Sequence, residues 1–267
     1  MQKYSPSLAD DHNFYSCPIL FPTKPNTSFN MNPEDQNINS GIAYTKGQSI
    51  SLLSRSDRPD NNLVVVIIEC IRVGKGIPSQ TVIVRVSNSN DSENTTRFAK
   101  FYDPSFFTPD PNTFEGSAGE YMKTAHAKKV ESYERMKKFQ GISVPRFFGD
   151  YQHMKENGES VDVILLENVP VRSLDKFRPP KNEMELLQTQ CETALCHVHS
   201  CGVVHNDICA ENILWNRDDG RVIICDFANA TTRDVFEGAS HVLEYYISID
   251  DGYLSWTLKN MYTDVIQ

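Results

Sequence analysis

The sequence predicts an α+β protein in which a strand-rich part with one helix comes first and a helical part follows. Runs rich in valine and isoleucine, at about 63–68 and 81–86, have the composition of strands. Two longer stretches are predicted to be helices. The stretch at 115–138 has no proline and places apolar residues along one face, and the stretch at 182–200 is closed by Gly202.

The other predicted strands are short and depend on the turns between them. Glycine and proline at 74–78 turn the chain between the first two strands, so these are expected to form a hairpin. A loop with three prolines at 103–114 separates the first three strands from the first helix. The remaining strands are expected at 97–102, 147–151, 161–166, 213–215 and 222–225.

The first 60 residues differ in composition from the rest of the chain. Six of the 14 prolines lie there, among Asn, Ser and Asp, with only isolated aromatic residues between them. Because no period of two or 3.6 is sustained, we expect 1–60 to be a polar extension that is loop-rich or partly disordered. The alternative is that its aromatic side chains dock onto the folded part, which is expected at 61–267.

Composition excludes several classes of function. The 267 residues are 39% hydrophobic and 23% charged, and the net charge of −9 gives no global basic field, so no nucleic-acid partner is expected. The longest apolar stretch, at 63–71, contains Glu69 and is far shorter than the ~20 residues that a bilayer requires, so no membrane is expected. Seven cysteines without an apolar leader predict reduced thiols and an intracellular location, cytoplasmic or nuclear.

The stretch at 205–212 carries the chemistry, together with an acidic residue fourteen positions later. Phosphoryl transfer from a nucleotide needs a carboxylate near the acceptor hydroxyl, oxygen ligands for Mg²⁺ and a cation on the phosphates. Asn212 and Asp226 supply the hard oxygen atoms that Mg²⁺ prefers. A loop with Asp207 and Asn212, beside a short hairpin that ends in Asp226, would place all three around one nucleotide. The plainer alternative is that these residues only cap turns.

These residues resemble the motifs of the protein-kinase-like fold. His205, Asp207 and Asn212 match the His-x-Asp-x-x-x-x-Asn pattern, and the Asp-Phe-Gly position reads Asp226-Phe227-Ala228. Lys100, on the third predicted strand, stands where this family has its phosphate-binding lysine. The segment at 139–145 resembles the Leu-Gln-Gly…Val-Pro of kinase-like proteins abundant in fungi, and the resemblance covers about 63–235.

The resemblance implies a two-lobe fold. A small antiparallel β-sheet with one helix would form an N-lobe at about 61–167, and a shortened, mainly helical C-lobe would occupy about 168–267. The stretch after Asp226 is too short for the peptide-docking part of a full kinase. The chain is therefore expected to be either a minimal kinase-like protein or a piece of a longer one.

The resemblance also implies an activity, with ATP and Mg²⁺ as cofactors. Asp207 would orient or deprotonate the acceptor hydroxyl, and Asn212 and Asp226 would hold Mg²⁺. Lys100 would contact the α and β phosphates. The main chain of Glu167 and Val169 would pair with adenine. The acceptor of the γ-phosphoryl group would be Ser or Thr of a protein, with a small-molecule hydroxyl as the other possibility.

Departures from the family pattern favour a second hypothesis, a pseudokinase that binds a nucleotide or serves as a scaffold without catalysis. Only Gly74 and Gly76 remain of the glycine-rich loop, and Pro78 after them has no amide proton. Cys209 stands where protein kinases place a lysine that faces the γ phosphate. The helix position expected to give Lys100 its glutamate partner aligns best with Lys129.

Overall fold

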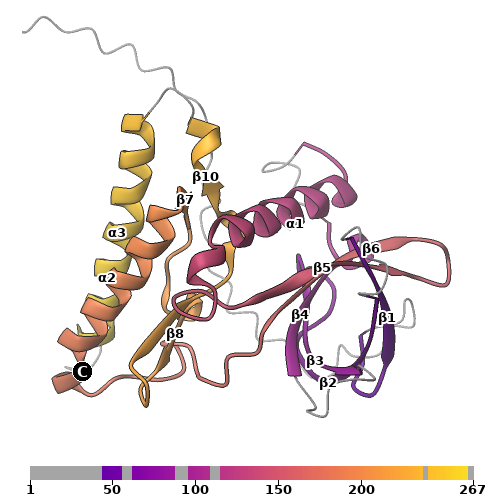
Figure 1. The fold of residues 1–267 in the computed structure, drawn as a ribbon, viewed down its shortest axis with the longest axis horizontal. Helices are drawn as coiled ribbons and strands as arrows, with labels where there is room; N and C mark the ends of the chain where they lie inside the picture. Colours follow the sequence, from indigo (N-terminus) through magenta and orange to yellow (C-terminus); the bar gives the residue numbers. More distant parts are fainter. Residues whose placement is uncertain (1–43, 56–61, 88–95, 109–114, 237–239, 264–267) are drawn as a thin grey trace, which may run out of the picture.

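The first part of the chain forms a closed barrel of six antiparallel strands (Figure 1). The computed structural model describes residues 44–55, 62–87, 96–108, 115–236 and 240–263. Within these residues the barrel order is β1-β2-β3-β4-β6-β5. The strands are β1 (Ser49–Ser54), β2 (Leu63–Arg72), β3 (Gln80–Ser87), β4 (Thr96–Tyr102), β5 (Phe147–Met154) and β6 (Ser160–Glu167).

The barrel is held together by its apolar interior. Successive side chains of a strand point to opposite faces, so every second residue of each strand lies inside. In β1 these residues are Ile50 and Leu52, while Ser49, Ser51 and Leu53 face outward. The interior residues are Ile50, Leu52, Val65, Ile67, Val82, Val84, Ala99, Phe101, Tyr151, Val161, Val163 and Leu165, with Tyr44 packed among them.

Helix α1 (Ala118–Arg135) covers the outside of the barrel at β4, β5 and β6. It begins at a capping box, in which the Ser117 hydroxyl accepts from the Glu120 amide and the Glu120 carboxylate accepts from the Ser117 amide. Met122 and Tyr133 of α1 pack in a second apolar core that also includes outward-facing residues of β4 and β6. The helix is therefore the element that connects the barrel to the rest of the chain.

The remaining elements form the other side of this second core. Helix α2 (Met184–Ser200) lies beside α3 (Ser240–Thr263), and in Figure 1 this pair lies on the left, the barrel on the right and α1 above the barrel. Two small antiparallel sheets accompany them. They pair β7 (Val203–Val204) with β10 (Thr231–Thr232) and β8 (Ile213–Asn216) with β9 (Arg221–Ile224). Among the described residues, no helix has both the length and the apolar character needed to cross a membrane.

The two-lobe kinase fold expected from the sequence is wrong. Six strands close into a barrel where a small open sheet was expected, and the described residues contain three α-helices, too few for a mainly helical C-lobe. The physical reason for the closure is β1, which pairs with β2 on one side and with β5 on the other. It lies inside the stretch 1–60 that was expected to be loop-rich, because its alternation of serine with apolar residues at 49–52 is too short to stand out as a period of two.

The remaining predictions concern the elements from residue 63 onward, the N-terminal extension and the division of the chain into parts. Each strand and helix predicted from 63 onward has a counterpart at its expected place, and the structure adds β7, β10 and α3. Of the extension expected at 1–60, residues 1–43 and 56–60 lie outside the described residues. The division into parts at 61–167 and 168–267 stays a prediction.

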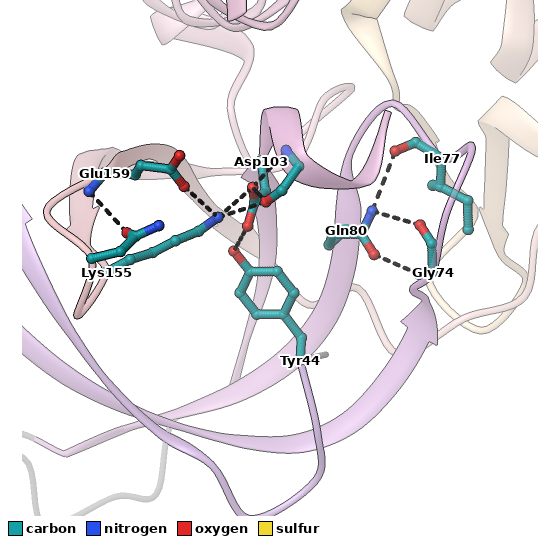
Figure 2. A network of polar contacts seen from close by, with 9 residues as sticks. Tyr44, Gly74, Ile77, Gln80, Asp103, Lys155 and Glu159 are labelled. Carbon is teal, nitrogen blue, oxygen red and sulfur yellow. Dashed lines mark hydrogen bonds and ion pairs between the residues drawn. The ribbon is translucent and has the colours of Figure 1, made fainter. Parts of the chain in front are cut away.

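A polar network closes one end of the barrel (Figure 2). Asp103, just after β4, is 1% exposed, accepts from the Tyr44 hydroxyl at 3.0 Å and accepts from Lys155 Nζ at 2.7 Å. The amide of Ser105 also donates to it at 3.0 Å. Burial alone would raise the pKa of Asp103, but Lys155 and Ser105 outweigh it and hold that pKa below its ordinary value.

Replacing Asp103 by asparagine is expected to reduce the dependence of stability on acid. Because the folded-state pKa of Asp103 is depressed, its contribution is complete above the unfolded pKa of ~3.9 and is lost as pH falls towards the folded-state value. The free energy of unfolding of Asp103→Asn should therefore fall less steeply than that of wild type below about pH 5. Urea titrations across this range measure the effect, with exposed Glu156→Gln as the control. Equal slopes for wild type and Asp103→Asn would refute the assignment.

Candidate functional site

Three charged side chains from distant parts of the chain meet between the barrel and α1. Lys100 of β4 and Lys129 of α1 both contact Oδ1 of Asp226, at 2.8 Å and 2.6 Å. The lysine side chains are 9% and 1% exposed, while the Asp226 side chain is 37% exposed. We call Lys100, Lys129 and Asp226 the lysine–aspartate cluster. Two buried cations thus share one carboxylate that reaches solvent.

The backbone at Asp226 holds the carboxylate in this position. Asp226 follows β9 and has a φ of +66°, in the left-handed region that non-glycine residues rarely adopt. The next residue, Phe227, is fully buried, with its ring centroid 5.5 Å from that of Tyr133 and 4.8 Å from that of His205. The packing of Phe227 and the two ion pairs stabilise a backbone conformation that is otherwise unfavourable.

The charges in the cluster do not balance. Burial would raise the pKa of Asp226, but Lys100 and Lys129 outweigh it and hold that pKa well below its ordinary value. Burial lowers the pKa of Lys100, Asp226 opposes this, and the neighbouring Lys129 lowers it further. With all three groups ionised, two ammonium groups face a single carboxylate, so the cluster has a net positive charge. An additional anion would therefore be stabilised here.

The His205 side chain fixes the loop at 205–212 through both of its ring nitrogens. His205 is fully buried, and its Nδ1 accepts from the Asp207 amide at 3.2 Å. Its Nε2 therefore carries the proton and donates to the Cys225 carbonyl at 2.9 Å. This bond connects the loop to the residue just before Asp226. His205 thus has a structural role in this loop.

Helix α3 holds the same loop through one buried carboxylate. Asp250 is 0% exposed and accepts from the amides of His205 at 2.7 Å and Asn206 at 2.9 Å. It also accepts from His199 Nε2 of α2 at 3.1 Å. The sequence reasoning missed Asp250, because nothing in its neighbourhood along the chain marks it as different from Asp251.

Asp207 and Asn212 lie together, as the sequence expectation requires. Asn212 Nδ2 donates to the Asp207 carbonyl at 2.9 Å and to its Oδ2 at 3.3 Å. Asn229, three residues after Asp226, donates to the same Oδ2 at 3.4 Å. The amide of Cys225 donates to the Asn212 carbonyl at 2.9 Å. The loop that carries Asp207 and Asn212 is thus bonded to the turn that carries Asp226, while the catalytic and metal-binding roles of these residues stay predictions.

Glu167 and Val169 make contacts within the protein. Glu167 ends β6, its amide donates to the Arg146 carbonyl at 2.8 Å, and its carboxylate accepts from the Arg146 amide at 3.1 Å. The Val169 carbonyl accepts from the Val171 amide at 2.8 Å. These bonds fix the segment after β6. The expected pairing with adenine stays a prediction.

The turn between β2 and β3 is also bonded to the protein (Figure 2). The Gly74 amide donates to Oε1 of Gln80 at 2.6 Å, and Gln80 Nε2 donates to the carbonyls of Gly74 and Ile77 at 3.0 Å and 3.2 Å. The Gly76 amide donates to the Phe106 carbonyl at 2.7 Å. A loop that covers phosphates uses such amides as donors, so both glycine amides are already engaged. The sequence showed the loss of glycines but not the part played by Gln80.

The arrangement is unfavourable for Mg²⁺ at Asp226. Two ammonium groups lie against Oδ1, and a dication that approached the same atom would be repelled by both. The thiol of Cys225 next to it is no substitute ligand, because burial raises its pKa to about 12. Within the described ranges, no three His, Cys, Asp or Glu side chains gather as a metal site. Mg²⁺ binding through Oδ1 of Asp226 therefore requires both lysines to move away from that atom.

Comparison with known proteins gives a short similarity to a kinase. No family model matches the chain. Over 64 residues it is 39% identical to the inactive tyrosine-protein kinase RYK of Caenorhabditis elegans. This match covers 23% of the present chain and 11% of that protein. Part of the chain is thus similar to a kinase described as inactive, which supports the expected kinase-like relation over a limited stretch.

Proposed function

We propose that the protein is a non-catalytic module of the pseudokinase type that binds a phosphate-bearing ligand, such as a nucleotide. The observation that carries the proposal is the lysine–aspartate cluster. Lys100 and Lys129 are buried cations with a single carboxylate between them. Phosphate oxygens accept strong hydrogen bonds from ammonium groups, and a phosphate would offset the unbalanced positive charge.

The non-catalytic part of the proposal has three supports. Phosphoryl transfer needs Mg²⁺ on the phosphates, and Asp226 is held by two lysines. The glycine amides of the turn at 74–78 are bonded to Gln80 and Phe106. The kinase to which part of the chain is similar is itself described as inactive.

Ligand binding is expected to stabilise the protein and to depend on Lys100. A ligand present at 100 times its Kd should add ~2.7 kcal/mol to the free energy of unfolding. Thermal melts with ATP, against adenosine as the ligand without phosphates, measure this. Lys100→Met should abolish the stabilisation, while Lys128→Met, an exposed lysine on α1, should leave it unchanged. A protein that melts at the same temperature with and without ATP contradicts the proposal.

One observation favours a second candidate, an ATP-dependent phosphotransferase that acts on a hydroxyl. Asp207 and Asn212 are held together in a loop that His205 and Asp250 fix, as a catalytic loop requires. Incubation with labelled ATP, Mg²⁺ and candidate protein or small-molecule acceptors tests it. Transfer by wild type well above that of Asp207→Asn would support this candidate and exclude the non-catalytic one. Equal transfer by both would exclude catalysis.

A further inference from the structure

Lys129 is an unusual residue to find at the centre of a core. Helix α1 carries other lysines, and those at 123 and 128 are exposed to solvent, as is common for this side chain. Lys129 is 1% exposed, and its Nζ contacts Asp226 Oδ1 at 2.6 Å. The same Nζ lies 5.8 Å from the ring centroid of Tyr102. A buried ammonium needs such compensation, so this lysine is placed by the fold.

The chemistry of the ammonium group resembles that of a small hard cation in one respect. It is a compact point charge with three N–H donors. One donor is directed to Asp226, and among the described residues no other oxygen atom is bonded to this Nζ, so two donors remain for additional oxygen atoms. In many nucleotide sites, Mg²⁺ binds one or two carboxylates and the phosphate oxygens of the ligand. Lys129 therefore offers the same connection, from the Asp226 carboxylate to phosphate oxygens, without a metal.

Lys129 and a divalent metal compete for the same atom. Nζ lies at hydrogen-bond distance from Oδ1, so a metal that bound this oxygen would have to displace it. Lys100 lies against the same oxygen at 2.8 Å, so neither side of it is clear of positive charge. A metal could therefore bind Oδ1 of Asp226 only after both lysines had withdrawn from that atom.

We infer that Lys129 serves as a built-in cation that replaces the divalent metal on Asp226, so that the protein binds a nucleoside polyphosphate without Mg²⁺. This inference rests on the proposed function. The ligand class is a metal-free polyphosphate, whose oxygens are bound by Lys100 and Lys129, while Asp226 fixes the two ammonium groups. No bond is formed or broken in this event.

Titration calorimetry with ATP, in EDTA and in excess Mg²⁺, tests the inference on the unmodified full chain. The expected Kd in EDTA is equal to that in Mg²⁺ or lower. Binding only in the presence of Mg²⁺ overturns the inference and leaves the proposed function standing. No binding of ATP under either condition overturns the proposed function itself. Wild type needs no substitution for this comparison, so loss of folding cannot obscure it.

Two substitutions of Lys129 then test whether this residue is the cation that replaces the metal. Lys129→Met removes the built-in cation and should weaken ATP binding in EDTA by about tenfold, the effect of one charged hydrogen bond. Lys129→Glu gives Lys100 a partner of opposite charge and leaves Asp226 to a metal, so ATP binding should become dependent on Mg²⁺. Lys128→Met on the same helix is the matched control. Variants at Lys129 that fold and bind ATP in EDTA as wild type does would refute the role of this lysine.

Discussion

Replacing Asp250 by alanine is expected to destabilise the protein by about 3–5 kcal/mol, because several donors lose one shared acceptor. Its carboxylate is fully buried and accepts from the amides of His205 and Asn206 and from the ring of His199. After the substitution these donors remain in the core without an equivalent partner. The free energy of unfolding from urea titration measures the loss.

The neighbouring residue supplies the control for this prediction. Asp251 is 61% exposed and lies 4.0 Å from His199 Nδ1, so Asp251→Ala should cost less than about 1 kcal/mol. Amide exchange gives a second readout, because the amides of His205 and Asn206 should exchange faster in Asp250→Ala. If the two variants are equally stable, Asp250 does not hold the loop.

Replacing Asp226 by asparagine is expected to cost about 3 kcal/mol, because two buried ammonium groups lose their only charged partner in the cluster. The amide of asparagine has nearly the shape of the carboxylate but no charge, so the change is electrostatic rather than one of packing. The estimate is at the lower end for buried charges because the Asp226 side chain is 37% exposed. Urea titration again gives the measurement.

A double variant separates this cause from others. Lys129→Met should restore part of the stability when it is combined with Asp226→Asn, since it removes one unpaired charge and keeps most of the apolar stem. Asp234→Asn is the comparison, because Asp234 pairs with Arg135 at an exposed position and its loss should cost less than about 1 kcal/mol. Additive effects of Asp226→Asn and Lys129→Met would show that the cluster is not coupled.

The spacing of motif residues predicted which side chains meet, although the expected fold was wrong. Asp207, Asn212 and Asp226 were named from their residue types and spacing, and Lys100 from the resemblance to the kinase-like fold. The structure places Lys100 against Asp226 and bonds the loop with Asp207 and Asn212 to the turn that carries Asp226. The prediction of these residues was possible because the position of a side chain on a strand, a loop or a hairpin depends mainly on the sequence of that element. The pairing of Lys129 with Asp226 was not predicted, although the count along α1 had singled out Lys129.

Two features could not be read from the chain. Gln80 holds the turn between β2 and β3 only because the turn folds back over its side chain. Asp250 is indistinguishable in sequence from exposed Asp251 next to it, and its burial depends on how α3 packs against the loop at 205–212. The residues next to Gln80 and Asp250 in the sequence do not indicate their roles, because the hydrogen-bond partners of both lie in other elements or across a turn.

The sequence by itself determined the places of most strands and helices and the identity of the charged residues, because periodicity, turn residues and spacing act over a few positions. The tertiary structure alone decided that the sheet closes. Closure requires Leu53 and Ser54 of β1 to pair with Gln152 and Tyr151 of β5, about a hundred residues later, and local pattern does not record such a contact. It also decided that Lys129 contacts Asp226, because a lysine on a helix face is buried or solvated according to what packs against that face.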